Sequence, residues 1–181
     1  MLATPRAERL LPTGTVTFLF TDIEGSTALT MRVGDLRAMG LIRAHDAIVR
    51  TALGTHGGQE VKHTGDGIMA SFTSVAAAVQ AAIAIQNRVA ERNSQATDAL
   101  HLRVGVSCGE PVTEEGDLFG AAVELAARLC ASGNAGGILV SSAVREVCLG
   151  KGFVFEDRGS AELKGFSEPV RLYGVRAQTA P

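Results

Sequence analysis

The sequence has no excess of charge of either sign. Its 181 residues include 17 lysines and arginines and 19 aspartates and glutamates, which give a net charge of −2. Proteins that bind nucleic acid usually gather basic residues on one face, because the phosphate backbone dominates their affinity. The balanced composition therefore gives no reason to expect nucleic acid as a partner.

Long apolar runs are also missing. No uncharged apolar stretch approaches the roughly 20 residues that an α-helix needs to span a bilayer. The start of the chain carries Arg6, Glu8 and Arg9 and has no apolar core long enough for a secretory signal. We therefore expect no membrane segment in this chain and a cytoplasmic location.

Cysteine and histidine are scarce and show no metal-binding pattern. Cys108, Cys130 and Cys148 share no ligand spacing, and an odd count without a signal peptide is typical of reduced thiols in the cytosol. We expect them to be small buried residues. His45 and His63 have no second histidine at ligand spacing, so structural or surface roles are expected for both.

The remaining composition is that of one globular domain. Hydrophobic residues make up 46% of the chain, and its length allows one domain with a substantial core but not two. We place that domain at residues 14–176. An N-terminal extension of residues 1–13 precedes it, and a short tail of residues 177–181 follows.

Strand-like and helix-like segments alternate along the chain. Apolar, β-branched runs predict strands at residues 15–20, 60–63, 68–72, 102–108, 138–140, 153–155 and 170–175. Helical spacing and capping residues predict helices at residues 35–53, 75–92 and 119–129, and after Ser141 or Ser142. Five residues of the first of these helices are expected on or near its core face: Leu36, Met39, Ile42, Val49 and Leu53. Residues 113–117 are expected to form a polar loop.

The order of these elements predicts an α+β fold. Strand, helix, strand, strand, helix, strand is the order of a ferredoxin-like βαββαβ core, with a mostly antiparallel sheet and helices on one face. The hairpin between the two long helices, turning at residues 64–67, distinguishes this fold from a doubly wound sheet. Further helices and strands follow the core.

Two segments carry an aspartate beside a glycine at the end of a strand. Asp22 follows the first strand, and Asp66 lies at the tip of the predicted hairpin, which neighbours that strand in a ferredoxin-like sheet. Two carboxylates suffice to hold Mg²⁺ or Mn²⁺ when substrate phosphates supply further oxygens. The backbone amides after Asp22 lead into a helix start and are expected to cradle phosphates. These amides belong to Ile23, Glu24, Gly25, Ser26 and Thr27.

The sequence resembles a known family at three motifs in order. They are Phe-Thr-Asp-Ile-Glu-Gly-Ser-Thr at residues 20–27, Val-Lys-His-Thr-Gly-Asp-Gly at residues 61–67, and Gly-Asp-Leu-Phe-Gly-Ala-Ala-Val-Glu-Leu-Ala-Ala-Arg at residues 116–128. Together they resemble the catalytic domain of class III nucleotidyl cyclases over about Gly14 to Arg176. The resemblance implies conversion of a nucleoside triphosphate to its 3′,5′-cyclic monophosphate and pyrophosphate. It also implies a head-to-tail homodimer with interfacial active sites and two Mg²⁺ or Mn²⁺ ions in each.

The same resemblance implies roles for individual residues. Asp22 and Asp66 match the metal-binding aspartates, and the carbonyl of Ile23 matches a further metal ligand. Arg128 matches an arginine that stabilises charge in the transition state. Lys164, in Glu-Leu-Lys-Gly-Phe, is a weaker match to a lysine that contacts the phosphates.

Lys62 and Asp117 match the pair that selects the base, and their chemistry favours ATP. Lysine can donate to N1 of adenine, and aspartate can accept from its N6 amine. Guanine presents an acceptor at O6 and a donor at N1, so both protein groups would be mismatched. The sequence therefore predicts an adenylyl cyclase.

Glu124 departs from the family pattern, which has asparagine at this position to orient the ribose. A carboxylate cannot donate to the ribose and adds negative charge near the triphosphate. Glu124 can instead pair with Arg128 one helical turn later, which predicts reduced turnover or an unusual metal preference and no catalytic role for Glu124. Two alternatives therefore stay open: a weakly active or inactive nucleotide-binding or dimerisation module, and a guanylyl cyclase.

Overall fold

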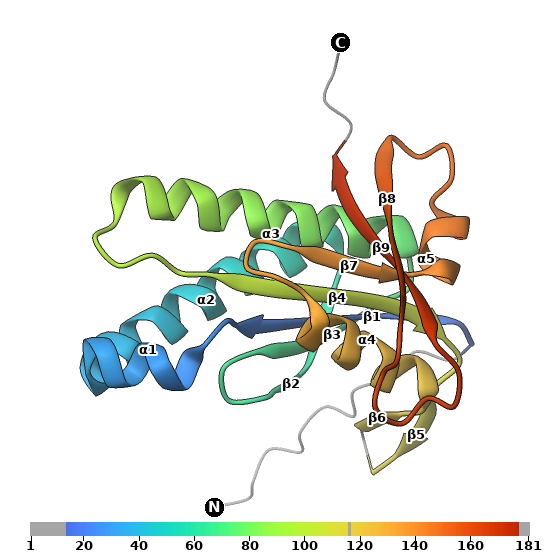
Figure 1. Cartoon of the computed structure of the whole chain (residues 1–181), viewed down its shortest axis with the longest axis horizontal. Coiled ribbons are helices and arrows are strands. Elements are labelled where there is room, and N and C mark those ends of the chain that lie inside the picture. The colour runs from blue at the N-terminus through green and yellow to red at the C-terminus, as the bar shows by residue number, and fades with distance from the viewer. Residues whose placement is uncertain (1–13, 116, 178–181) are drawn as a thin grey trace, which may run out of the picture.

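The computed structural model describes residues 14–115 and 117–177. The predicted extension, residues 1–13, and residues 178–181 of the predicted tail lie outside the described residues. Within these ranges seven strands form one sheet in the order β2-β3-β1-β4-β7-β9-β8, as Figure 1 shows. The strands are β1 (Val16–Ile23), β2 (Gln59–His63), β3 (Ile68–Phe72), β4 (Leu102–Gly109), β7 (Ile138–Ser141), β8 (Phe153–Ala161) and β9 (Val170–Ala177).

The helices and a small hairpin complete the described fold. The helices are α1 (Ser26–Val33), α2 (Asp35–His56), α3 (Val75–Gln95), α4 (Ala121–Ser132) and α5 (Ser142–Val147). The hairpin consists of β5 (Val112–Glu114) and β6 (Asp117–Phe119), where a polar loop was expected. Asp117 is therefore held in a strand, and α4 begins after Gly120 instead of at Phe119.

The sheet confirms the predicted α+β fold with a ferredoxin-like core. β1 lies between β3 and β4 and is antiparallel to both, and β2 pairs antiparallel with β3. β4 and β7 pair in parallel, and β9 is antiparallel to β7 and β8. The late strands are thus antiparallel to each other, as the sequence predicted.

Helices cover both faces of the sheet. Phe18 and Leu19 are neighbours on β1 but belong to different apolar clusters, because successive strand residues point to opposite faces. Leu19 packs in the cluster that holds the buried residues of α2 and α3. Phe18 packs with Val123 and Ala126 of α4. The two core helices therefore share one face, and α4 covers the apolar residues of the other.

The core face of α2 differs from the prediction. Leu36 and Met39 are 89% and 51% exposed, so the expectation that they face the core was wrong. The helix buries a stripe at helical spacing that includes small and polar members. Its buried residues are Ala38, Leu41, His45, Val49, Ala52 and Leu53. At 3.6 residues per turn Leu36 lies on the side opposite this stripe and Met39 lies beyond its edge, so the two large apolar side chains indicated the wrong face.

Predicted helix caps are confirmed for two later helices. The hydroxyl oxygen of Ser74 accepts from the amide of Ala77, and that of Ser141 accepts from the amide of Val144. Asp35 is not the cap of α2; Gly34 is, and Asp35 lies in the first turn. None of the helices in residues 14–115 and 117–177 has the length and hydropathy to cross a membrane.

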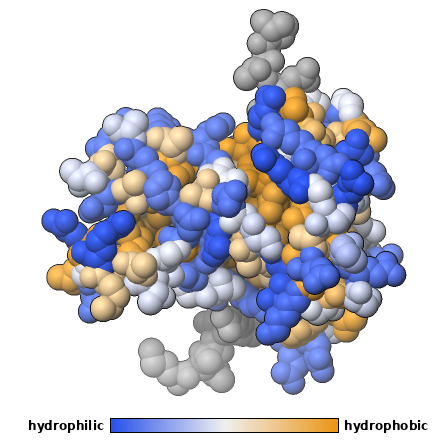
Figure 2. All heavy atoms as spheres, in the orientation of Figure 1, coloured by the Kyte–Doolittle hydropathy of each residue, from blue (hydrophilic) through white to orange (hydrophobic). Residues whose placement is uncertain are grey.

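The surface is mixed in character. Figure 2 shows hydrophobic residues gathered over the middle of the face turned to the viewer, where β4 and β7 lie, with hydrophilic residues around them. Partly buried apolar side chains near this area include Leu125 of α4 and Leu139 of β7. This face also carries α4, as Figure 1 shows.

Candidate active site

The segments that carry Asp22 and Asp66 are in direct backbone contact. The amide of Ile23 donates to the carbonyl of Asp66 at 3.1 Å. Gly67 lies so close to β1 that a Cβ at this position would be 2.0 Å from the carbonyl oxygen of Thr21. A glycine is therefore required for the hairpin tip to rest on the end of β1. The fold brings the two predicted metal-binding segments together.

A buried thiol lies near this end of β4. Sγ of Cys130 donates to the carbonyl of Arg103, the residue opposite Asp22, at 3.4 Å. Burial, followed by the charge of Asp22, raises the pKa of Cys130 to about 12. Cys130 is therefore a buried thiol with little tendency to ionise, and its burial was expected from the sequence.

Each carboxylate has a protein partner. The hydroxyl of Ser26 donates to Oδ2 of Asp66 at 2.5 Å. The guanidinium of Arg103 donates to Oδ2 of Asp22 through Nε, at 3.0 Å, and through Nη2. Burial disfavours the charge of Arg103, but its bonds with Asp22 outweigh burial and raise the pKa of the guanidinium.

Sequence reasoning missed Arg103. This residue lies directly opposite Asp22 in the register of β1 and β4, and its Nη1 also donates to the carbonyl of Ala131 at 3.0 Å. A signal was present in the sequence, because Arg103 interrupts an otherwise apolar strand. Its partner is 81 residues away, so only the strand pairing reveals the contact.

The oxygen atoms at this end suit a hard divalent cation. Asp22 and Asp66 are both partly buried carboxylates, and Mg²⁺ and Mn²⁺ prefer such oxygen ligands. In the described parts of the chain, no three His, Cys, Asp or Glu side chains form a metal-binding group. The residues therefore fit an open site, in which the Ile23 carbonyl and substrate phosphates complete the ligands, and do not fit a closed structural site.

Fewer backbone amides than expected are available to contact phosphates after Asp22. The amide of Ile23 is used by the Asp66 carbonyl, and the amide of Glu24 donates to the carbonyl of His101 at 2.9 Å. The amides of Gly25, Ser26 and Thr27 remain, at the N-terminus of α1. A cavity of about 220 Å³ opens beside them and is lined by Glu24, Gly25, Ala28, Leu29, Arg32, Ala99 and His101.

Lys62 and Asp117 form an ion pair although they are 55 residues apart in sequence. Nζ of Lys62 donates to Oδ2 of Asp117 at 2.5 Å, and the amide of Leu118 donates to Oδ1 at 2.8 Å. Desolvation acts to raise the pKa of Asp117, but these bonds and the lysine charge hold it below its ordinary value. Nζ of Lys62 also lies 5.5 Å from the centroid of the Phe119 ring. The structure thus joins the two residues expected to read one base.

Arg128 and Glu124 lie one turn apart on α4 and form the predicted pair. Nη2 of Arg128 is 3.6 Å from Oε2 of Glu124, which is longer than a hydrogen bond. Nε of Arg128 is buried and has no acceptor among the described residues. A buried donor without an acceptor is costly, so this atom is suited to receive an oxygen from a ligand.

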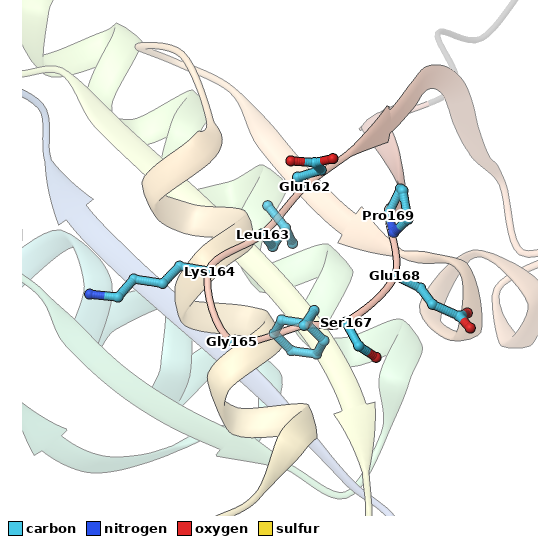
Figure 3. Close-up of a pocket in the computed structure, with 8 residues that line it drawn as sticks. Glu162, Leu163, Lys164, Gly165, Ser167, Glu168 and Pro169 are labelled. Atoms are coloured by element: carbon cyan, nitrogen blue, oxygen red, sulfur yellow. The ribbon is translucent and has the colours of Figure 1, made fainter.

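Lys164 lies on the loop between β8 and β9. This loop, residues 162–169, encloses a pocket of about 500 Å³. Figure 3 shows that the side chain of Lys164 points away from that pocket. Leu163 anchors the loop by packing against Leu129 of α4. The structure therefore places Lys164 on a loop attached to the helix that carries Arg128. Among the described residues, no hydrogen bond or ion pair joins it to Asp22 or Asp66.

Lys62 and Asp66 belong to the same β2–β3 hairpin. Lys62 pairs with Met69, and Met69 pairs with Phe20 of β1, two residues before Asp22. Two residues of strand span roughly 7 Å, so Lys62 lies near the level of Asp22 along the sheet. Asp117 reaches Lys62 from the β5–β6 hairpin, which follows the far end of β4, as Figure 1 shows.

Comparisons with known proteins identify the family. Residues 9–177 match the family described as the adenylate and guanylate cyclase catalytic domain. The chain is 36% identical over 129 residues to a putative adenylate cyclase 3 of Rhizobium meliloti, covering 70% of this chain. It spans only 22% of the length of that relative.

Solved structures show the same fold. An adenylate/guanylate cyclase/hydrolase from Silicibacter pomeroyi has a TM-score of 0.82 at 30% identity, covering 90% of this chain and 96% of the other. The adenylyl cyclase CyaB from P. aeruginosa has a TM-score of 0.78 at 25% identity, covering 93% and 98%. The chain belongs to the class III nucleotidyl cyclase family, as an adenylate and guanylate cyclase catalytic domain.

Proposed function

We propose that this domain is an adenylyl cyclase, which converts ATP to 3′,5′-cyclic AMP and pyrophosphate in a head-to-tail homodimer. The observation that carries the proposal is the contact between Lys62 and Asp117, at 2.5 Å. This contact presents one donor and one acceptor side by side, which is the complement of the adenine edge. The adenylate cyclase names of several relatives support the same substrate.

Base selection follows from the polarity of this pair. Lys62 would donate to N1 of adenine, and Asp117 would accept from the N6 amine. Guanine would place its O6 acceptor against the aspartate and its N1 donor against the lysine. An unpaired buried polar group costs about 1–3 kcal/mol, and more when it is charged. This is enough to favour ATP over GTP by about tenfold to a hundredfold.

Asp22, Asp66 and the Ile23 carbonyl would hold two divalent cations together with the triphosphate. Metal bound there would lower the pKa of the ribose 3′-hydroxyl and offset phosphate charge. Arg103 holds Asp22 through its guanidinium and would have to release a carboxylate oxygen for that binding. The amides of Gly25, Ser26 and Thr27 would contact the β- and γ-phosphates.

Arg128 would act on the reacting phosphate. Its buried Nε has no acceptor among the described residues, so an α-phosphoryl oxygen or the leaving pyrophosphate would supply one. Charge-assisted hydrogen bonds to such oxygens stabilise the transition state as negative charge develops. Lys164, an exposed residue on a loop anchored to α4, would contact the triphosphate from the same side.

The hydrophobic area over β4 and β7 in Figure 2 supports a site shared by two chains, because a second chain would cover it. In a head-to-tail arrangement, Asp22 and Asp66 of one chain would meet Lys62, Asp117 and Arg128 of the second. Two equivalent sites result.

The direct test is cyclic nucleotide formation by the purified chain. We expect cyclic AMP with ATP and Mn²⁺ or Mg²⁺, and kcat/KM for GTP lower by at least about tenfold. The dimer fraction is measured in parallel by analytical ultracentrifugation. A dimeric sample that forms no cyclic AMP at saturating ATP would show that the proposal is wrong.

A second candidate is a nucleotide-binding or dimerisation module with little turnover. The observation in its favour is the pair between Glu124 and Arg128, which ties the arginine to its own helix. Such a module would bind ATP, as calorimetry can show, without forming product. The same assay therefore separates the two functions.

A further inference from the structure

A carboxylate on α2 receives hydrogen bonds from two imidazoles. Oδ1 of Asp46 accepts from Nδ1 of His45 at 2.9 Å and from Nε2 of His63 at 3.1 Å. Desolvation acts to raise the pKa of Asp46, but the bonds from both histidines outweigh it, so the group is an ionised acceptor. Each imidazole therefore uses one nitrogen as the donor to Asp46, and its other nitrogen is left to accept.

Two chains of hydrogen bonds, called arms below, start at Asp46. The first arm runs through His45 to the sheet. Nε2 of His45 accepts from the hydroxyl of Thr21 at 2.8 Å, and that hydroxyl oxygen accepts from the amide of Ile68 at 3.1 Å. His45 and Thr21 are both buried. Burial also lowers the pKa of His45, which agrees with a neutral ring that accepts at Nε2. The first arm thus passes through Thr21, the residue before Asp22, and ends on Ile68, the first residue of β3.

The second arm runs through His63 to the hairpin tip. Nδ1 of His63 accepts from the amide of Gly65 at 3.2 Å. The two arms therefore reach the backbone on both sides of Asp66, at Gly65 and at Ile68. Within the turn, the amide of Thr64 donates to the carbonyl of Gly67 at 2.9 Å. One carboxylate on α2 thus holds both ends of the segment that carries Asp66.

This hydrogen-bond network matters for metal binding because Mg²⁺ tolerates little variation in the positions of its ligands. Mg²⁺ takes its ligands at about 2.0–2.1 Å in near-octahedral geometry. A satisfied buried polar network fixes one arrangement of the groups that it joins. Without the network, the hairpin tip would be free to shift against the end of β1. Groups that orient metal ligands commonly change metal affinity or activity by about 10- to 100-fold when they are removed.

We propose that Asp46 is a positioning residue for metal binding. Acting through the two imidazoles, it sets the separation of the Asp22 and Asp66 carboxylates and so the affinity of this end of the chain for divalent metal. The inference rests on the proposed function, because it takes these two aspartates as the metal ligands.

The experiment measures binding of Mn²⁺ alone to the purified full chain, by electron paramagnetic resonance of the free ion. Asp46→Ala removes the acceptor for both rings and is expected to weaken Mn²⁺ binding by about tenfold or more. Asp46→Asn keeps an acceptor oxygen and is expected to restore most of the affinity. The control Glu60→Ala removes the ion pair of Glu60 with Arg50, at 2.7 Å. Nη1 of Arg50 also donates to Oδ2 of Asp46, at 3.3 Å, and the control keeps this bond and both arms. It is expected to leave Mn²⁺ affinity unchanged.

A second variant keeps the inference falsifiable if Asp46→Ala does not fold. His63→Ala cuts only the arm to the hairpin tip, and the side chain of His63 is 33% exposed, so folding should survive. We expect severalfold weaker Mn²⁺ binding with an unchanged circular dichroism spectrum. Folded His63→Ala and Asp46→Ala proteins that bind Mn²⁺ as well as Glu60→Ala does would refute the positioning role.

The Asp22→Ala variant separates this failure from failure of the proposed function. If Asp22→Ala weakens Mn²⁺ binding and Asp46→Ala does not, only the positioning role is wrong. If Asp22→Ala binds Mn²⁺ as the unaltered chain does, the assignment of Asp22 as a metal ligand is wrong, and the positioning role of Asp46 is wrong as well.

Discussion

Glu124 is the residue that departs from the family pattern within the proposed site. Its carboxylate lies 3.6 Å from Arg128 and is largely exposed, so the attraction between them is weak. Pairs at this helical spacing contribute about 0.2–0.5 kcal/mol. The pair therefore biases the position of Arg128 without locking it. This fits an enzyme with reduced turnover better than an inactive one.

Glu124→Asn is expected to raise kcat for ATP by about twofold to tenfold, since it frees Arg128 and removes a negative charge near the triphosphate. The free energy of unfolding should fall by only about 0.5 kcal/mol, because one weak helical pair is lost. Steady-state kinetics and urea denaturation measure both effects. Glu124→Gln serves as the control for loss of charge at nearly unchanged length. A fall in kcat for both variants would show that the carboxylate itself assists the reaction.

Among the elements, α4 is placed by an unusually close approach to β4. A Cβ at Gly105 would lie 2.3 Å from the carbonyl oxygen of Ala126 and from the amide nitrogen of Cys130. Backbone atoms cannot turn aside as a flexible side chain can, so the helix itself would have to move. The position of Arg128 therefore depends on a glycine in a neighbouring strand.

Gly105→Ala is expected to destabilise the protein by about 1–3 kcal/mol through overpacking and to lower kcat by displacing Arg128. Chemical denaturation and steady-state kinetics report the two effects. Gly54→Ala is the matched control, because Gly54 is an exposed helical residue with no atom within 4 Å of the added Cβ. That control should be neutral or slightly stabilising. Equal stability of the two variants would contradict the close packing.

At the scale of the whole molecule, the proposed sharing of each site between two chains leads to a prediction about mixed variants. Asp22→Ala and Arg128→Ala should each be nearly inactive, because each removes a group from every site. When they are mixed, half of the dimers carry one variant of each kind, and one of their two sites is intact. Random association therefore predicts recovery of about a quarter of the unaltered activity.

The control is a mixture of Asp22→Ala with Asp66→Ala, which should recover nothing because both residues belong to the same half of the site. Formation of mixed dimers is checked by energy transfer between labelled chains. Confirmed mixed dimers without recovered activity would exclude an interfacial site.

Much of the fold could be predicted because its signals are local. The β-branched run at residues 15–20 and the capping serines at positions 74 and 141 predict their elements from a few neighbouring residues. The core face of α2 was misread, because its buried stripe includes small and polar residues such as Ala38 and His45, and large apolar residues lie outside it. Leu36 and Met39 are exposed although they are apolar. The β5–β6 hairpin was missed because its short strands lack an apolar pattern.

The candidate site was less predictable than the fold. Asp22, Asp66, Lys62, Asp117 and Arg128 were expected from their motifs. The use of two turn amides by protein carbonyls was not, because it depends on the contacts of Asp66 and His101. His45 and His63 were expected in structural or surface roles, and the structure adds that both bind Asp46.

The sequence by itself determined the order of the elements, the family and the residue types at each motif, since all of these are carried by short segments. Only the tertiary structure decided which side chains meet. Lys62 reaches Asp117 across 55 residues, and Arg103 reaches Asp22 across 81. Strand pairing and helix packing create such contacts, and they join segments that are far apart in the chain. For that reason the pair of Lys62 with Asp117, the partner of Asp22 and the two arms from Asp46 appear only in the folded protein.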